Sequence, residues 1–211
     1  MLDRVTLARR LLLLTAGCVV LGIGVAVLLA ADLGSDGFST LVNGAARASG
    51  VPFVVANLVV SVGFLLVAAS RRLLPGVGTV VQVVVVGLVV SVLLPLLDTP
   101  SSYAARGMLL VVALPVLALG IAAYLAGRLG AGPIESAALA WDPPVPFRWS
   151  YGLAQGGSAL LGWLLGGTIG LGTVAVVVLL GPLVDLAGRL LRLEVHQPMA
   201  GGERGEPTPG G

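Results

Sequence analysis

Six long apolar runs, separated by polar breaks, dominate the pattern of hydrophobic and polar positions along this chain. They cover residues 11–31, 53–70, 79–97, 108–126, 149–165 and 173–191. Each holds about 17 to 21 residues, which at about 1.5 Å per residue is the length that an α-helix needs to cross the hydrocarbon core of a bilayer. The pattern therefore predicts an all-α membrane protein with six transmembrane helices.

Two shorter segments between these runs fit neither a simple span nor a simple loop. One is SDGFSTLVNGAARASG at residues 35–50, and the other is AGPIESAALAWDPPVPF at residues 131–147. Both are too polar for a span and too apolar for an ordinary solvated connection. We expect each to form a short helix that enters the membrane and returns. Such broken helices are tolerated only where protein or water satisfies the freed backbone groups.

The two short segments belong to a sequence pattern that occurs twice in the chain. A Leu-Gly break at residues 33–34 recurs at 129–130, an offset of 96, and a Gly-x-Gly-Thr element at residues 76–79 recurs at 170–173, an offset of 94. Matching glycines at two separate elements are hard to obtain by chance. The chain therefore divides into a first membrane repeat at 1–97, a second at 98–193, and a tail at 194–211. The polar, Gly/Pro-rich composition of that tail predicts disorder.

Arginine supplies all twelve basic residues and indicates how the repeats are oriented. Arginines also precede the first apolar run, which is longer than the roughly 7–15 residues of a signal peptide, so we expect that run to remain as a span. If both short segments re-enter and the N-terminus is cytoplasmic, ten arginines lie inside and two, Arg47 and Arg106, lie outside. If the short segments cross, eight passes result, and Arg71, Arg72 and Arg128 lie outside instead.

Because arginine is enriched on the cytoplasmic side of membrane proteins, this distribution favours six spans, by a margin of one charge. An odd number of spans per repeat inverts the second repeat relative to the first. Inverted repeats with broken helices that meet near the midplane are the plan of many secondary transporters. The sequence thus predicts a plasma-membrane protein with both termini in the cytoplasm.

Glycine and proline mark the places where the helices break. Structural turns are expected at Gly34, Gly76, Gly78, Gly130, Gly132, Pro133, Gly170 and Gly172. Pro133 suits the first position of a helix, and Asp36 is the expected N-cap of the first short helix. The threonines of the two Gly-x-Gly-Thr elements are expected to cap the helices that follow. Both short helices would then aim their N-termini at the protein interior, where such termini attract anionic or carbonyl groups.

Composition narrows the function classes. Of the 211 residues, 57% are hydrophobic and 10% are charged, whereas soluble domains carry about 25% charged residues. The net charge of +2 provides no clustered basic surface, so nucleic acid is not an expected partner. Cys18 and His196 are the only residues of their types. We therefore expect no intrachain disulfide, no metal site, no cofactor and no enzyme activity.

Candidate substrate contacts are the polar residues of the short helices and of the spans beside them. They are Asp36, Ser39, Thr40, Asn57, Glu135, Ser136 and Gln155. Ionisable groups at membrane depth are commonly functional, which favours Glu135. A structural reading stands beside the functional one: Glu135 as a first-turn carboxylate at a helix N-terminus, and Asn57 and Gln155 as makers of interhelical hydrogen bonds. Gln82 and Ser91 are further polar residues within spans.

The stretches LGIGVAVLLAADLG, RLGAGPIESAAL, PGVGTV and GTIGLGTVAVVVLLGPLVDL resemble the YczE-like bacterial membrane proteins, grouped with the YyaS and YitT names. The resemblance covers roughly residues 11–191 and implies the family phrase LG-x-GP-x-D. The second repeat keeps its glycines and proline, with Glu135 where aspartate is usual. The first repeat departs from it at Asp36, Gly37 and Ser39. Transport and support of secondary-metabolite production are the functions that this resemblance implies.

Three functional hypotheses follow. The first is a small-solute secondary transporter, with its site between the repeats and a small zwitterion or a weak organic acid as the ligand. The second is a non-transporting accessory protein that supports another enzyme or an exporter. A membrane enzyme ranks last, since no nucleophile–base pair or phosphate-binding motif is present. The lipid bilayer is the one certain partner, and the sequence leaves a homo-oligomer open.

Overall fold

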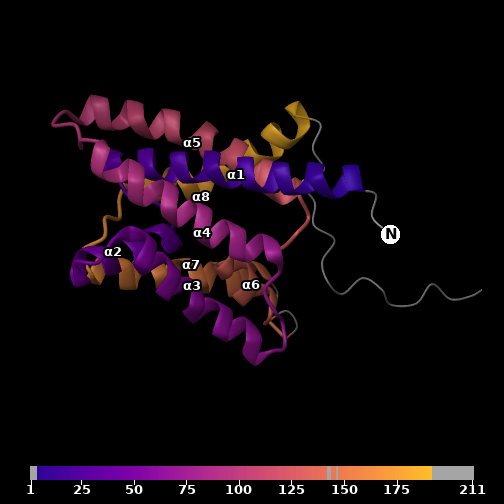
Figure 1. Cartoon of the computed structure of the whole chain (residues 1–211). Helices are drawn as coiled ribbons and strands as arrows, with labels where there is room; N and C mark the ends of the chain where they lie inside the picture. The colour runs from indigo at the N-terminus through magenta and orange to yellow at the C-terminus, as the bar shows by residue number, and fades with distance from the viewer. Residues whose placement is uncertain (1–3, 142–143, 146, 192–211) are drawn as a thin grey trace, which may run out of the picture.

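The chain folds into a bundle of α-helices, shown in Figure 1. The computed structural model describes residues 4–141, 144–145 and 147–191; the predicted disordered tail lies outside them. Within these residues the elements are α1 (Arg4–Ala31), α2 (Gly37–Ser49), α3 (Phe53–Ser70), α4 (Val77–Leu93), the 3-10 turn η1 (Leu94–Leu96), α5 (Tyr103–Ala126), α6 (Pro133–Leu139), α7 (Phe147–Leu164) and α8 (Leu171–Leu190). The predicted all-α class is confirmed for this part of the chain.

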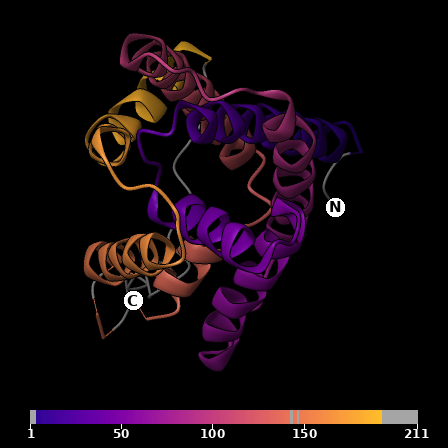
Figure 2. The same cartoon turned by 90° about the vertical axis from the view of Figure 1, so that its left-hand side faces the viewer.

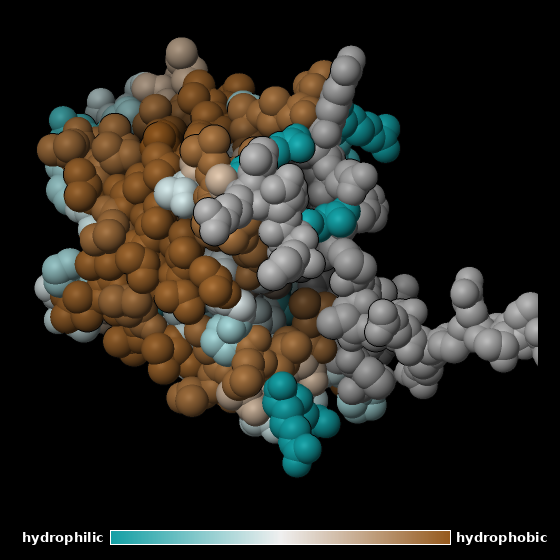
Figure 3. Space-filling view, turned by 45° about the vertical axis from the view of Figure 1, so that its right-hand side comes forward, coloured by the Kyte–Doolittle hydropathy of each residue, from teal (hydrophilic) through white to brown (hydrophobic). Residues whose placement is uncertain are grey.

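Five of these helices are long and apolar enough to cross a membrane: α1, α3, α5, α8, and α4 together with η1. They correspond to five of the six predicted spans. The sixth, α7, is helical where a span was predicted but is not among the five candidates. Figure 3 shows a face covered mainly by apolar side chains, with hydrophilic residues gathered toward its two ends. The chain is therefore a multi-pass membrane protein.

The helices form two groups, and each group contains helices from both halves of the chain. α1 packs most extensively on α5, with α4 beside α1 and α8 beside α5. In the second group α2 packs on α7 and α3 packs on α6. Figure 2 shows the two groups one above the other, with α4 running between them. Every one of these main pairs, apart from α1 with α4 and α5 with α8, joins one half of the sequence to the other.

The α1–α5 contact depends on glycines that let the two backbones approach closely. A Cβ added to Gly24 would lie 2.9 Å from the backbone nitrogen of Leu117, and one added to Gly120 would lie 2.5 Å from that of Leu21. Gly120 lies 96 positions after Gly24, and Leu117 lies 96 positions after Leu21. This is the offset of the Leu-Gly repeat. Small residues at helix crossings are the usual means of close packing inside membranes.

Each Leu-Gly break docks on the Gly-x-Gly-Thr element of the other half. The backbone N–H of Gly172 donates to the carbonyl of Leu33 at 2.7 Å, and the N–H of Gly78 donates to that of Leu129 at 2.8 Å. Gly34 and Gly130 follow these leucines with φ angles of 99° and 143°, a region that side chains rarely adopt. The chain thus satisfies the freed backbone of each broken helix with the start of a helix from the other half.

The two threonines of these elements act differently. The hydroxyl of Thr173 accepts from the N–H of Gly170 at 3.4 Å, as an N-terminal cap of α8. The hydroxyl of Thr79 instead donates to the carbonyl of Ala131 at 2.6 Å, in the other half of the chain. The expectation that both threonines cap their own helices is therefore wrong for Thr79, because the break at residues 129–131 leaves the carbonyl of Ala131 free of helical hydrogen bonds and close to this hydroxyl.

Replacing Thr79 with valine should lower the thermal unfolding midpoint by about 2–4 °C, since it keeps the shape but loses a buried hydrogen bond of about 1 kcal/mol. The measurement is thermal unfolding of the purified protein in detergent. Ser70→Ala is the control, because Ser70 makes a hydrogen bond at the exposed end of α3 with Val67 of the same helix. An equal decrease in both variants would contradict the docking role of Thr79.

Candidate functional site

The site begins at the N-terminus of α2, which is held by side chains from both halves of the chain. The carboxylate of Asp36 accepts from the N–H of Ser39 at 3.0 Å, which confirms the predicted N-cap. The side-chain oxygen of Gln155, on α7, accepts from the N–H of Phe38 at 3.2 Å. The amide nitrogen of Gln155 donates to the hydroxyl of Tyr151 at 2.8 Å. A second-half side chain thus completes the first turn of a first-half helix.

The two predicted hydroxyl contacts of α2, Ser39 and Thr40, are both buried. The hydroxyl of Thr40 lies 2.9 Å from that of Ser35, just before the helix, so these two groups form a hydrogen bond within the turn. The turn is therefore closed by its own polar side chains.

Glu135 stands in the first turn of α6, a helix of seven residues that is too short to span a bilayer. Gly132 is the N-cap and Pro133 is the first residue of this helix. Burial raises the pKa of the Glu135 carboxyl from 4.5 to about 7; its own backbone N–H lowers this pKa, and the charge of Asp36 raises it further. The neighbouring Ser136 is buried, and its hydroxyl donates to the carbonyl of Ala131 at 3.3 Å.

Asp36 and Glu135 come from opposite halves of the chain and are near enough to interact electrostatically. We call the surroundings of these two carboxylates and of Gln155 the polar region. Because Asp36 and Glu135 both carry acidic side chains, that region favours a proton or a cation over an anion.

Gln82, on α4, is the residue whose place in this region was not predicted. A Cβ added to Gly132 would contact the carboxylate of Glu135 and would lie 3.0 Å from the side-chain oxygen of Gln82. That oxygen is buried and has no hydrogen-bond partner. The signal was present in the sequence as a polar residue inside an apolar run, but nothing in the sequence placed Gln82 of the first half beside the N-cap of α6 in the second.

Asn57 and Gln155 were both expected to contact substrate or to make interhelical hydrogen bonds, and the structure gives them different partners. The amide of Asn57, which is 3% exposed, donates to the carbonyl of Val83 at 2.8 Å and joins α3 to α4. Gln155 contacts α2 instead. Both side chains therefore make the interhelical hydrogen bonds of the structural reading, and Gln155 also lies in the polar region.

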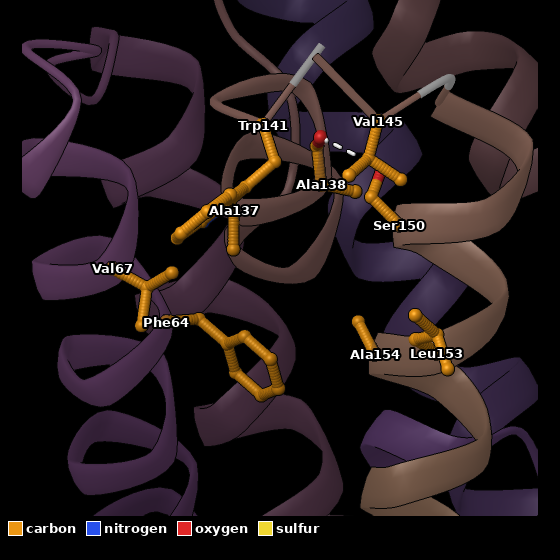
Figure 4. A pocket seen from close by; sticks show the side chains of 9 residues that line it. All are labelled: Phe64, Val67, Ala137, Ala138, Trp141, Val145, Ser150, Leu153 and Ala154. Carbon is orange, nitrogen blue, oxygen red and sulfur yellow. Dashed lines mark hydrogen bonds between the residues drawn. The ribbon is translucent and has the colours of Figure 1, made fainter. Parts of the chain in front are cut away.

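An apolar groove lies beside the polar region, between α3, α6 and α7 (Figure 4). It has a volume of about 270 Å³ and is lined by Phe64, Val67, Ala137, Ala138, Trp141, Val145, Ser150, Leu153 and Ala154. The hydroxyl of its one polar side chain, Ser150, donates to the carbonyl of Ala138 at 2.9 Å. Phe64 also packs against Phe38 of α2, with ring centroids 5.9 Å apart, so the groove adjoins the first turn of α2.

These features define the class of the protein as a multi-pass helical membrane protein with a polar interior region and an apolar groove. Among the described residues no three His, Cys, Asp or Glu side chains gather as metal ligands. The chain belongs to a family of unknown function, DUF6198, which matches residues 8–189.

The chain is also similar to an uncharacterized protein of Haemophilus influenzae, with 27% identity over 183 residues that cover 85% of this chain and 83% of that protein. No solved structure matches the chain. The family match gives no reaction or substrate, and the resemblance to the YczE-like group stays a prediction.

Proposed function

We propose that the protein is a secondary transporter for a small solute in the bacterial plasma membrane, with both termini in the cytoplasm. Its site lies between the starts of α2 and α6. The observation that supports this proposal is that the charge of Asp36, at the start of α2, acts on Glu135 in the first turn of α6, while Gln155 binds that same turn of α2. Transporters place their sites where broken helices from two repeats meet.

Two inverted repeats of three spans each are part of this proposal, with α7 as the sixth span. Reciprocal contacts support it: Gly24 with Leu117 is matched by Gly120 with Leu21, as expected for a two-fold axis between the halves. The charges agree with a common outer side. Arg106 and Arg47, the two arginines assigned to the outside, lie 3.5 Å and 3.9 Å from the carboxylate of Asp32.

Cysteine labelling tests the inverted arrangement. In a Cys18→Ala background, Ser49→Cys at the end of α2 should react with a membrane-impermeant maleimide from outside the cell. Pro144→Cys, just after α6, should react only once the membrane is opened. Both positions are exposed in the structure. Labelling of both from the same side would overturn the inverted repeats, since these positions follow equivalent short helices.

The polar region favours an amine-bearing ligand. The first turn of α2 already has acceptors for its N–H groups in Asp36 and Gln155, so an anion would find fewer free donors there. The carboxylate of Glu135 and the unpartnered side-chain oxygen of Gln82 are both acceptor groups. An unpaired buried acceptor costs about 1–3 kcal/mol, which a ligand N–H would relieve. Of the two expected ligand classes, the small zwitterion therefore fits better than the weak organic acid.

Three small probes separate these ligand classes: L-alanine, ethylamine and propionate. We expect the first two to raise the thermal midpoint of the purified protein and propionate to leave it unchanged. Gln82→Leu should remove the shift, whereas Ser91→Ala, on the same helix, should keep it, because the Ser91 hydroxyl accepts from the N–H of Val54 away from α6. A shift with propionate alone would contradict the amine preference.

A non-transporting accessory protein is the second candidate, and the apolar lining of the groove favours it. A partner helix or an apolar product could lie there without any solute crossing the membrane. The two candidates differ in uptake by proteoliposomes that contain this chain alone, which only a transporter supports. A homo-oligomer stays a prediction for either candidate.

A further inference from the structure

The groove between α3, α6 and α7 opens on the surface of the bundle. Of the side chains that line it, Val67 is 42% exposed, Trp141 is 38% exposed and Leu153 is 74% exposed. Figure 4 shows Val67 and Trp141 on one wall and Leu153 on the opposite wall, with Phe64 between them. At membrane depth such a recess faces hydrocarbon, and apolar surface there is covered by lipid chains or by protein.

A positive charge stands at one end of this groove. Arg71 follows the last residue of α3, and its guanidinium lies 4.2 Å from the centre of the Trp141 ring. Arg72 comes next, and both arginines are exposed. Among the described residues no carboxylate lies within 4.0 Å of either guanidinium. Tryptophan and arginine at the end of a span are typical of the membrane–water interface.

We propose that this groove binds an anionic phospholipid, with one acyl chain between α3 and α7 and the phosphate on Arg71. The charge selects the occupant, because basic recesses between transmembrane helices bind anionic headgroups, whereas a zwitterionic lipid gains less from a cation. Stacking on Trp141 fixes the guanidinium at the mouth of the groove, so the headgroup and the chain are recognised together. This site is separate from the proposed transport and does not depend on it.

The lipid would contact the part of the molecule that positions α2. Phe64 lines the groove and packs on Phe38, whose backbone N–H is bound by Gln155. An acyl chain in the groove would hold the Phe64 ring against α2. The structure therefore assigns the lipid a supporting position under the first turn of a short helix.

Native mass spectrometry of the delipidated full chain tests the proposal. The probes are phosphatidylglycerol and phosphatidylcholine with identical acyl chains. We expect the wild type to retain one phosphatidylglycerol in preference to phosphatidylcholine. Arg71→Gln should reduce that preference by about fivefold, which is the loss of roughly 1 kcal/mol of attraction per arginine at the membrane surface. Ala154→Leu should remove retention of both lipids, since its side chain would fill the groove.

Matched controls lie on α8, which packs on α5 rather than beside the groove. Arg189→Gln removes an exposed arginine, and Gly181→Leu introduces the same leucine side chain where nothing lies within 4 Å of an added Cβ. Both should leave lipid retention as in the wild type. Equal retention of the two lipids by the wild type would overturn the proposal. A lipid-free dimer that Ala154→Leu separates would also overturn it, by assigning the groove to a second copy.

Discussion

Gly120→Leu is expected to abolish the folded protein, while Gly107→Leu in the same helix is expected to be tolerated. A Cβ at Gly120 would lie 2.5 Å from the backbone nitrogen and 2.7 Å from the Cα of Leu21, so α1 and α5 would have to separate. Overpacking of a tight core costs about 1–3 kcal/mol, and this contact is backbone, which cannot rotate away. At Gly107 nothing lies within 4 Å of an added Cβ.

The measurement is the yield of monodisperse protein in size-exclusion chromatography after extraction in a mild detergent. Gly24→Leu should resemble Gly120→Leu, because its added Cβ would meet Leu117 in the reciprocal contact. Normal yield for both Gly24→Leu and Gly120→Leu would show that α1 and α5 can separate without loss of the fold.

Glu135→Gln should abolish proton-coupled uptake by proteoliposomes while leaving the chain folded. The amide keeps the shape of the side chain but carries no exchangeable charge. A loss of at least about tenfold is expected if this carboxyl carries the proton. The assay follows the probe that gives the largest thermal shift, with and without an imposed pH gradient. Asp185→Asn is the control, an exposed acid on α8, and it should transport normally. Unchanged uptake by Glu135→Gln would return this residue to a capping role.

The same substitution should change how stability depends on pH. Because burial raises the pKa of Glu135 from 4.5 to about 7, the folded protein binds this proton more tightly than the unfolded chain does. Wild-type stability is therefore highest below about pH 4.5 as far as this group is concerned, and it declines as the pH rises to about 7. Glu135→Gln should flatten that decline in thermal midpoints. An identical pH profile in the variant would contradict the raised pKa.

The sequence predicts the helices well because the apolar runs are long and the breaks carry specific residues. Phe53–Ser70 agrees with its prediction at both ends, and Asp36 caps α2 as expected. The span predicted at residues 149–165 is α7, but this helix carries Gln155 and Ser158 among its leucines. Those polar residues lower its hydropathy, and Gln155 also binds the first turn of α2.

The site was only partly predictable, because a repeat reveals which segments are equivalent but not which ones touch. The offset of 96 pairs Leu33 with Leu129, yet each of these residues docks on the opposite half. Asn57 and Gln155 are both amide side chains inside predicted spans, yet they bind different helices, because α3 lies beside α4 and α7 lies beside α2. The Gln82 side-chain oxygen lacks a hydrogen-bond partner because of how the helices pack, which the sequence does not reveal.

The crossed docking of the two breaks also sets an order for biogenesis. The carbonyl of Leu33 pairs with the N–H of Gly172, so its partner is synthesised almost at the end of the chain. At about 5–20 residues per second, translation leaves the first break without that partner for on the order of ten seconds. During that time the carbonyl of Leu33 lacks the partner that it has in the folded chain. Insertion factors and membrane proteases would meet this protein at that stage, and a ribosome that stalls before residue 172 would leave a product that they can recognise.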